Sequence, residues 1–273
     1  MSEWLISRLA LGALRPMRLG LTILALAAQP GLSQTVTPPG QVLTPAQEAA
    51  VRALVLQTIR DNPAIVGEAL QTLQTQAQDL ADAQAKDALK AQEANLFADP
   101  NAPVIGNPAG DVTVVEFFDY NCPYCKKAAP EVAALIAQDP MVRVVMREWP
   151  ILGPDSVYAA RAALAARSQG KFAEFHGAMF EEPHANEATV RRVATALGLD
   201  LDLLATEMGD ASVAAHLDLS NKLAASLGIN GTPGFVIGDA IIPGLASSQD
   251  LALAVAEARA QSHNTSAGGA SHD

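Results

Sequence analysis

Residues 112–127 read VTVVEFFDYNCPYCKK, and this stretch holds both cysteines of the 273-residue chain, Cys122 and Cys125. The β-branched and aromatic residues from Val112 to Phe118 predict a buried strand of a central sheet. A polar step follows, and then Pro123 suits the first position of a helix, because the N–H that proline lacks would have no partner there. The stretch therefore predicts a strand that leads directly into a helix, with Cys122 at the N-cap.

The N-cap position has a chemical consequence for Cys122. Unpaired N–H groups and the positive end of the helix dipole converge on its sulfur and favour the thiolate over the thiol. Cys125 lies one turn further along the same face, at about 5 to 6 Å between Cα atoms, and this separation suits a disulfide. The pair can therefore cycle between a dithiol and a disulfide.

Three other interpretations of the cysteine pair were weighed against redox chemistry. Half of a zinc site would require a second Cys/His pair at ligand spacing, which the sequence lacks. A purely structural disulfide stays open. From another class, a copper-binding or chaperone-like module would use Cys122 and Cys125 as soft ligands for Cu(I).

The start of the chain has the layout of a secretory signal. Three arginines precede the apolar run Leu19–Ala28, and small residues follow it. Such a run is too short to span a bilayer of ~30 Å, so residues 1–33 predict export and removal rather than a membrane anchor. Cleavage after Ser33 is preferred, and cleavage after Ala27 is the alternative.

Composition and charge narrow the classes of function. With 49% hydrophobic and 17% charged residues, the chain can bury a sizeable core in one main domain with an appendage. Without residues 1–33, 15 basic and 28 acidic residues remain, a net charge of −13. This charge makes nucleic acid and anionic lipid poor partners. Export also places the cysteine pair in an oxidising compartment.

Residues 34–98 predict a flexible lead-in and a helical extension. Thr44, Pro45 and Gln47 fit an N-cap, a first-turn proline and a capping box, so one helix should run to about residue 60 and a second over residues 64–97. In the second helix, apolar residues are spaced 4, 3, 4, 3, which suits either a partner helix from another subunit or a stripe on its own domain. These residues are Val66, Leu70, Leu73, Ala77 and Leu80.

The main domain begins near residue 99, after which the pattern alternates between strand and helix. A short strand is expected at residues 104–105 and a longer one at 142–148, so that strand, helix and strand form a right-handed βαβ unit. The cysteines then lie at the carboxyl end of its first strand, where open α/β sheets place their sites. The fold class is α/β.

The second half of the chain adds a helical insertion and a return to the sheet. The insertion is expected at about residues 150–228, with Phe172, Phe175, Met179 and Phe180 in its core. A hairpin over residues 234–242 follows a proline that suits an edge or a special turn, and can be cis. A helix at 250–260 and a loose tail at 261–273 close the chain. The histidines form no ligand cluster and are expected on the solvated surface: His176, His184, His216, His263 and His272.

These residues carry a resemblance. CPYC after VVEFF, a helical insertion and then TP before a hairpin resemble the thioredoxin fold of the DsbA family of periplasmic thiol-disulfide oxidoreductases, over about residues 99–260. DYNCPYCKK, EWPILGPDS and the helical leader most resemble the ScsC (suppressor of copper sensitivity) and Com1-like branch. Some members of this branch oligomerise through their N-terminal helices, so the resemblance implies a homo-oligomer at residues 34–98.

The resemblance also implies roles for single residues. Cys122 would be the attacking thiolate, Cys125 the resolving thiol and Pro233 a cis-proline that faces them. Thr232 would offer its backbone to an extended substrate chain by strand addition. Glu116 matches a buried acid that accepts or relays the proton of Cys125, and burial would raise its pKa. The alternative for Glu116 is a side chain that points to solvent.

In the same family, redox potential depends on the two residues between the cysteines, here Pro123 and Tyr124, and on the residue before the cis-proline. A histidine beside the second cysteine, found in strongly oxidising members, is absent here, and Thr232 resembles isomerase and reductase members. The implied activity is disulfide exchange in client proteins in the periplasm, with a DsbA-like oxidase as the alternative. A membrane-bound reductase or oxidase would be the redox partner, and no metal or organic cofactor is required.

Overall fold

A computed structural model describes residues 43–268 of the chain. Contacts divide the chain into two compact units, with the boundary between Ile65 and Val66. The proposed signal, residues 1–33, and the lead-in up to residue 42 lie outside the described residues. Between residues 43 and 268, no helix is both long enough and apolar enough to cross a membrane.

The first unit contains helix α1, Pro45–Asp61. Its start confirms the predicted capping box, because Thr44 Oγ1 accepts a hydrogen bond from Gln47 N and the Gln47 side chain accepts one from Thr44 N. None of the residues of α1 is buried. Since most helices in proteins owe their stability to packing of an apolar face, α1 gains little from the described contacts.

The predicted helix over residues 64–97 is divided into α2, Ala64–Ala91, and α3, Glu93–Phe97. Leu89 and Leu96 are buried against the sheet domain. The predicted apolar stripe lies further towards the N-terminus and faces solvent, with Leu73 and Leu80 each 61% exposed. This exposure excludes the interpretation in which the stripe rests on its own domain.

The second unit is built on a five-stranded sheet with the order β1-β3-β2-β4-β5. β2 and β3 are parallel, as predicted for a βαβ unit, and the other neighbours are antiparallel. The register places Phe118 beside Glu148 and Phe117 beside Gly234 at the end of β2 that leads to the cysteines. The strands are β1 (Val104–Gly106), β2 (Val112–Phe118), β3 (Val142–Glu148), β4 (Gly234–Ile237) and β5 (Ala240–Pro243).

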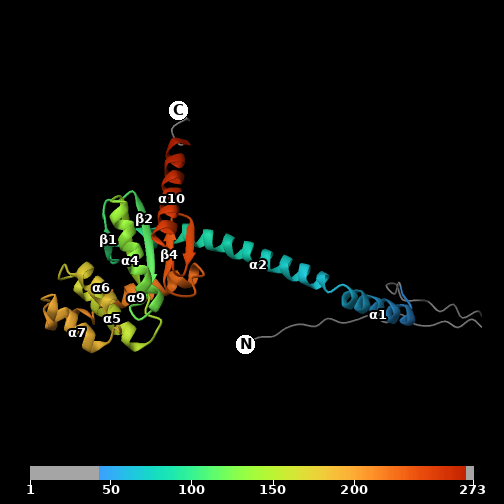
Figure 1. The fold of residues 1–273 in the computed structure, drawn as a ribbon, viewed down its shortest axis with the longest axis horizontal. Coiled ribbons are helices and arrows are strands. Elements are labelled where there is room, and N and C mark those ends of the chain that lie inside the picture. The colour runs from blue at the N-terminus through green and yellow to red at the C-terminus, as the bar shows by residue number, and fades with distance from the viewer. Residues whose placement is uncertain (1–42, 269–273) are drawn as a thin grey trace, which may run out of the picture. The chain divides into compact units, whose positions relative to one another are not determined.

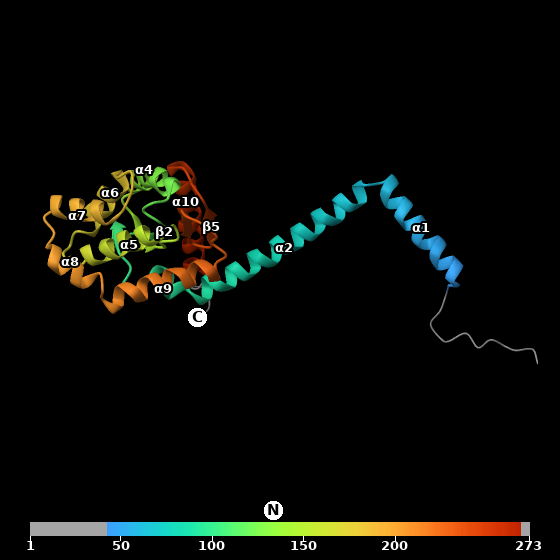
Figure 2. The same cartoon turned by 90° about the horizontal axis from the view of Figure 1, so that it is seen from below.

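Helices cover both faces of this sheet (Figures 1 and 2). Helix α4, Pro123–Gln138, and helix α10, Ser248–Gly268, pack on the face that carries Val114 and Val144. Helix α9, Ala211–Ser226, lies with the end of α2 on the face that carries Val115 and Val145. Alternate side chains of the strands thus pack into two hydrophobic cores, one on each face of the sheet. The central strand β2 is buried on both faces.

The helical insertion between β3 and β4 is confirmed. Helices α5 to α8 group beyond one end of the sheet in Figure 2, and the predicted core residues Phe172, Phe175, Met179 and Phe180 are buried. Glycines at positive φ terminate several of these helices, for example Gly198 at 70° after α7. The helices are α5 (Pro154–Ala166), α6 (Phe172–Glu181), α7 (Glu187–Ala196), α8 (Leu201–Glu207) and α9.

The last helix is longer than predicted. α10 spans Ser248–Gly268, so the prediction of a loose tail is wrong for residues 261–268, whereas residues 269–273 lie outside the described residues. No glycine or proline occurs in this helix before Gly268, and nothing in the sequence therefore stops it at residue 260.

Candidate active site

Cys122 lies at the N-cap of α4, as predicted, with φ −75° and ψ 120°. Pro123 is the first residue of the helix. The Cys122 side chain is only 5% exposed, and its Sγ donates a hydrogen bond to the carbonyl oxygen of Thr232 at 3.1 Å. The sulfur thus lies at the positive end of a helix and beside a backbone acceptor.

The Thr232–Pro233 peptide bond is cis and lies next to Cys122, although 110 residues separate Thr232 from the cysteine. β4 starts directly after Pro233 and pairs with β2, and this pairing brings the bond to the end of β2 that precedes the cysteines. Gly244 N donates a hydrogen bond to the Pro233 carbonyl at 2.8 Å. The structure therefore brings together Cys122, Thr232 and Pro233, which the sequence grouped only through the resemblance.

Cys125 lies behind Cys122 and has no exposed surface. Both thiols are free. Burial raises the pKa of the Cys125 thiol far above its usual value, and the neighbouring charges of Cys122 and Glu116 act in the same direction. Contacts with the backbone of Asp119 and the side chain of Thr232 oppose this rise only in part. Cys125 is therefore protonated near neutral pH.

Glu116 is buried within β2, 2% exposed, so the alternative that it points to solvent is wrong. Burial raises the pKa of its carboxyl group to about 8. One carboxyl oxygen, Oε1, has no hydrogen-bond partner among the described residues. The charge of this carboxyl group also acts on the Cys125 thiol and contributes to the rise of its pKa.

Residues 119–121, between β2 and Cys122, do more than end the strand. Asp119 is 1% exposed, and its carboxylate accepts hydrogen bonds from Asn121 N at 2.8 Å and from Leu152 N at 2.9 Å. Its carbonyl also accepts one from Cys122 N at 3.0 Å. Three consecutive polar residues between a buried strand and a reactive cysteine were the available signal, because buried polar groups must find partners.

Two histidines are buried, so the prediction of a solvated surface is wrong for His176 and His216. His176 stacks on Phe172, and its Nδ1 lies 3.1 Å from the Tyr120 hydroxyl; burial lowers its pKa to about 3, so it is neutral. His216 Nε2 lies 2.7 Å from a carboxylate oxygen of Glu148. An imidazole ring can be buried when another side chain partners its ring nitrogen. The sequence alone does not show that Tyr120 and Glu148 provide such partners. The side chain of His184 is 57% exposed, as predicted.

Exposed apolar side chains surround the cysteine site. Ile151 and Leu152 belong to the loop that Asp119 holds, Leu245 follows the Gly244 contact to Pro233, and Tyr124 lies in the first turn of α4. All four are between 43 and 56% exposed. These four exposed side chains, from two loops and a helix start, form an apolar rim beside the cysteine pair.

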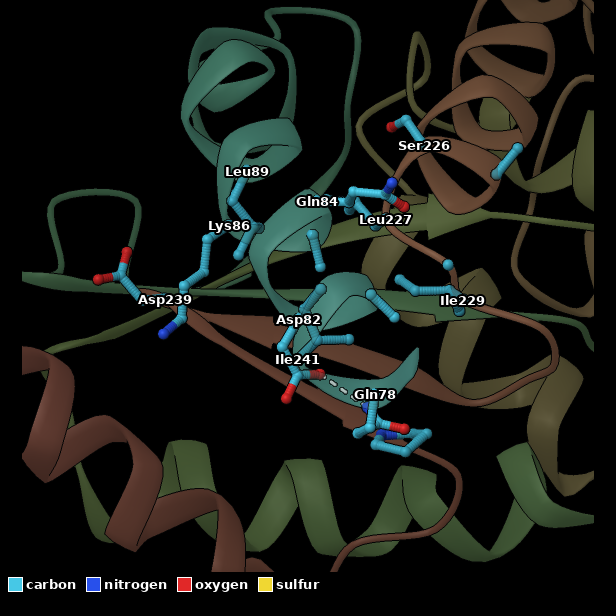
Figure 3. A pocket seen from close by; sticks show the side chains of 15 residues that line it. Gln78, Asp82, Gln84, Lys86, Leu89, Ser226, Leu227, Ile229, Asp239 and Ile241 are labelled. Carbon is cyan, nitrogen blue, oxygen red and sulfur yellow. Dashed lines mark hydrogen bonds between the residues drawn. The ribbon is translucent and has the colours of Figure 1, made fainter. Parts of the chain in front are cut away.

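A pocket of about 440 Å³ lies elsewhere in the second unit, between α2, the end of α9 and β5 (Figure 3). Its lining includes Leu89, Leu227 and Ile241, and Gln78 donates a hydrogen bond to Asp82 at 2.7 Å beside them. Neither cysteine lines it. The pocket is thus separate from the cysteine pair.

Solved structures with a similar fold include a thioredoxin-like oxidoreductase and an ScsC protein. A thioredoxin-like oxidoreductase from Silicibacter pomeroyi is 56% identical, covers 61% of this chain and 96% of its own, and superimposes with a TM-score of 0.60. Proteus mirabilis ScsC in a transitional conformation is 31% identical, covers 81% of this chain and 98% of its own, and has a TM-score of 0.59.

A curated relative of a different kind is the Na(+)/H(+) antiporter NhaA 3 of Salinispora tropica, 32% identical over 179 residues. The match covers 64% of this chain but only 28% of that antiporter, so the similarity concerns one part of a longer protein.

The family model of the DSBA-like thioredoxin domain matches residues 113–256, just over half of the chain. This range starts in β2, contains the CPYC segment, the insertion and the cis-proline, and ends in α10. It agrees with the region of the resemblance, and both solved structures above share the fold. The chain belongs to the family of DSBA-like thioredoxin domains.

Proposed function

We propose that this protein catalyses thiol-disulfide exchange in client proteins through Cys122 and Cys125. One observation carries the proposal: the Cys122 sulfur lies at the start of α4, 3.1 Å from the Thr232 carbonyl and beside the cis-proline, with a second free thiol buried one turn behind. A helix start favours the thiolate, which is the nucleophile of the reaction.

The reaction has two steps. The Cys122 thiolate attacks one sulfur of a client disulfide, so that a mixed disulfide forms and the other client sulfur leaves as a thiolate. The Cys125 thiolate then attacks Cys122 in the mixed disulfide, which releases the second client sulfur and leaves a Cys122–Cys125 disulfide. Two electrons pass from the protein to the client, and the reverse sequence oxidises a client dithiol.

Glu116 is proposed as the group that handles the proton of Cys125. The thiol is buried and keeps its proton, and the nearby carboxyl group has a pKa of about 8, so it can accept a proton near neutral pH and release it again. Without such a group, the second step would have to wait for solvent to reach a thiol that has no exposed surface.

Client chains are proposed to bind at the apolar rim around Cys122. The backbone of Thr232 precedes a strand and is suited to pairing with an extended segment, while Tyr124, Ile151 and Leu152 would contact its apolar side chains. The occupant is therefore a segment that is not yet folded around its own cysteines, because only such a segment is extended and exposes apolar side chains.

Among exchange reactions, isomerisation or reduction is favoured over pure oxidation. Tyr124, not histidine, precedes Cys125, and Thr232 precedes the cis-proline, a combination that resembles isomerase and reductase members of the family. A titration of the cysteine pair against glutathione measures its reduction potential. A reducing potential is expected, and a strongly oxidising one, near that of DsbA at about −120 mV, would contradict this assignment.

The setting of the activity is also proposed. The arginine-led apolar segment at residues 19–28 supports export to the periplasm, where a membrane-bound reductase or oxidase would reset the pair. The exposed stripe on α2 and the unburied α1 support self-association through these helices. Several thiol sites in one assembly suit a client whose bonds are exchanged repeatedly.

The central test compares cysteine variants of the mature chain in the presence of a metal chelator. Insulin reduction and refolding of scrambled ribonuclease are expected with the wild type and not with Cys122→Ser. Cys125→Ser should instead accumulate the mixed disulfide with the client, visible on non-reducing gels. Absence of exchange in the wild type, together with tight Cu(I) binding, would overturn the proposal in favour of a copper-binding module.

A further inference from the structure

Each side chain of the turn Asp119-Tyr120-Asn121 attaches the start of α4 to a different part of the fold. Asp119 binds the backbone of Leu152 after β3, and Tyr120 contacts His176 on α6. Asn121 binds Ala185 in the connection between α6 and α7. Hence this turn, which directly precedes Cys122, is fastened mainly by the loop after β3 and by the helical insertion rather than by the sheet.

Asn121 makes the most specific of these attachments. Its Oδ1 accepts a hydrogen bond from Ala185 N at 2.8 Å, and its Nδ2 donates to Ala185 O at 3.0 Å, so the amide pairs with both backbone groups of one residue. Nδ2 also lies 3.1 Å from the Ser156 hydroxyl on α5. Ala185 and Ser156 are buried, which makes these bonds costly to lose.

The same connection is held from the other side of Cys122. Lys126, in the first turn of α4, donates from Nζ to the carbonyl oxygen of Glu182. The connection between α6 and α7 is thus bound once before Cys122, by Asn121, and once after it, by Lys126. These two hydrogen-bonded contacts, one on each side of Cys122, restrict how the residues between Asn121 and Lys126 can move.

We propose that Asn121 is a positioning residue for the exchange reaction, which holds the Cys122 sulfur towards Thr232 by clamping the turn onto Ala185. This inference rests on the proposed function. The clamp acts through the backbone, because it fixes the residue next to Cys122. It thereby keeps the sulfur near the Thr232 carbonyl, now 3.1 Å away, where a client segment would pair. A small displacement of a reacting atom is enough to slow a reaction strongly.

The chain offers a control in Asn186, the N-cap residue of α7. Its side chain accepts a hydrogen bond from Thr189 N at 3.0 Å and caps α7. Asn186→Ala therefore removes a side-chain hydrogen bond next to Ala185 but leaves both hydrogen bonds between Asn121 and Ala185 in place. A merely structural role for Asn121 would make the two alanine variants behave alike.

The experiment measures three properties of Asn121→Ala, Asn186→Ala and the full wild-type chain: melting temperature, exchange rate with oxidised glutathione, and alkylation of each cysteine by iodoacetamide. We expect both variants to melt earlier, but only Asn121→Ala to slow exchange, by about tenfold or more. Its Cys122 should be alkylated faster than in the wild type while Cys125 stays protected, because the turn loosens without unfolding.

Exchange at the wild-type rate in Asn121→Ala, or equal slowing in both variants, would overturn the inference. Should Asn121→Ala not fold, Asn121→Asp retains the bond from Ala185 N and is expected to show a smaller loss with the same alkylation pattern. The proposed function fails separately, through absence of exchange in the wild type, while the alkylation pattern reports on the clamp without any exchange activity.

Discussion

Glu116 makes the stability of the protein depend on pH. Its pKa is about 8 in the folded chain and has its usual value of 4.5 after unfolding, so the folded state binds one more proton between these values. Stability should therefore fall as pH rises from about 4.5 to about 8 and level off above, by roughly 3–5 kcal/mol in total. In Glu116→Gln, which cannot ionise, urea denaturation at several pH values should lack this decrease.

The same variant tests the proton transfer. Glu116→Gln keeps the shape of the side chain but cannot accept the proton of Cys125, so release of client from the mixed disulfide should slow by about 10²-fold or more. Formation of the mixed disulfide involves only Cys122 and should be unaffected. Rapid-quench kinetics separate the two steps, and equal rates of release in both proteins would rule out a role for this carboxyl group.

Arg147 is buried as a charged group that has an ion-pair partner, whereas burial of Glu116 favours its neutral form. It is fully buried and pairs with Asp99 at 2.7 Å, which ties the segment before β1 to β3. Arg147→Met leaves the Asp99 carboxylate without this partner and should lower the free energy of unfolding by about 3–5 kcal/mol. Lys222→Met, at an exposed pair with Asp218 on α9, should cost about 1 kcal/mol or less. Similar losses in both would contradict this view.

At the scale of elements, the close packing of the β4–β5 turn against α10 requires a glycine at position 238. Gly238 has a φ of 55°, and a Cβ built on it would lie 2.9 Å from the Cβ of Ala258 on α10. Gly238→Ala should therefore combine backbone strain with overpacking and destabilise by about 2–4 kcal/mol. Gly228→Ala is the control, because its φ of 67° is similar but no atom lies within 4 Å, and it should cost about 1 kcal/mol.

Local signals in the sequence were sufficient for most elements. The capping box at Thr44 and the proline after Cys122 correctly predicted where α1 and α4 begin. The β-branched runs predicted β2 and β3. The end of α10 was missed because a stretch of small and polar residues fits both a helix and a tail. Helix ends that lack a glycine or proline remain the least legible feature.

At the scale of the molecule, the stripe on α2 leads to a prediction about assembly. Leu73 lies on the stripe with 61% of its surface exposed. If α2 pairs with α2 helices of other copies, Leu73→Glu would bury a charge in that seam and dissociate the assembly. Thr75→Glu, on the opposite side of the helix, should not. Sedimentation of the mature chain measures both, and a wild-type monomer would contradict self-association.

Long-range contacts are what the sequence could not supply. Cys122 and Cys125 were legible because their spacing is local, whereas the pairing of Asn121 with Ala185 joins residues 64 positions apart and involves a backbone that any residue would provide. Glu116 was recognised through a family pattern, but its burial follows from the sheet register. Sequence thus predicted the two candidate reactive thiols, and the structure was needed to find the groups that contact the residues beside them.

The complete enclosure of Cys125 has a consequence for the order of events. In the proposed exchange reaction, a client could not reach a thiol without exposed surface, so each encounter would start at Cys122 and each release would follow attack by Cys125. Oxidants and alkylating agents should likewise react first with Cys122. The order of the two proposed steps would then follow from access to the sulfurs as well as from their intrinsic reactivity.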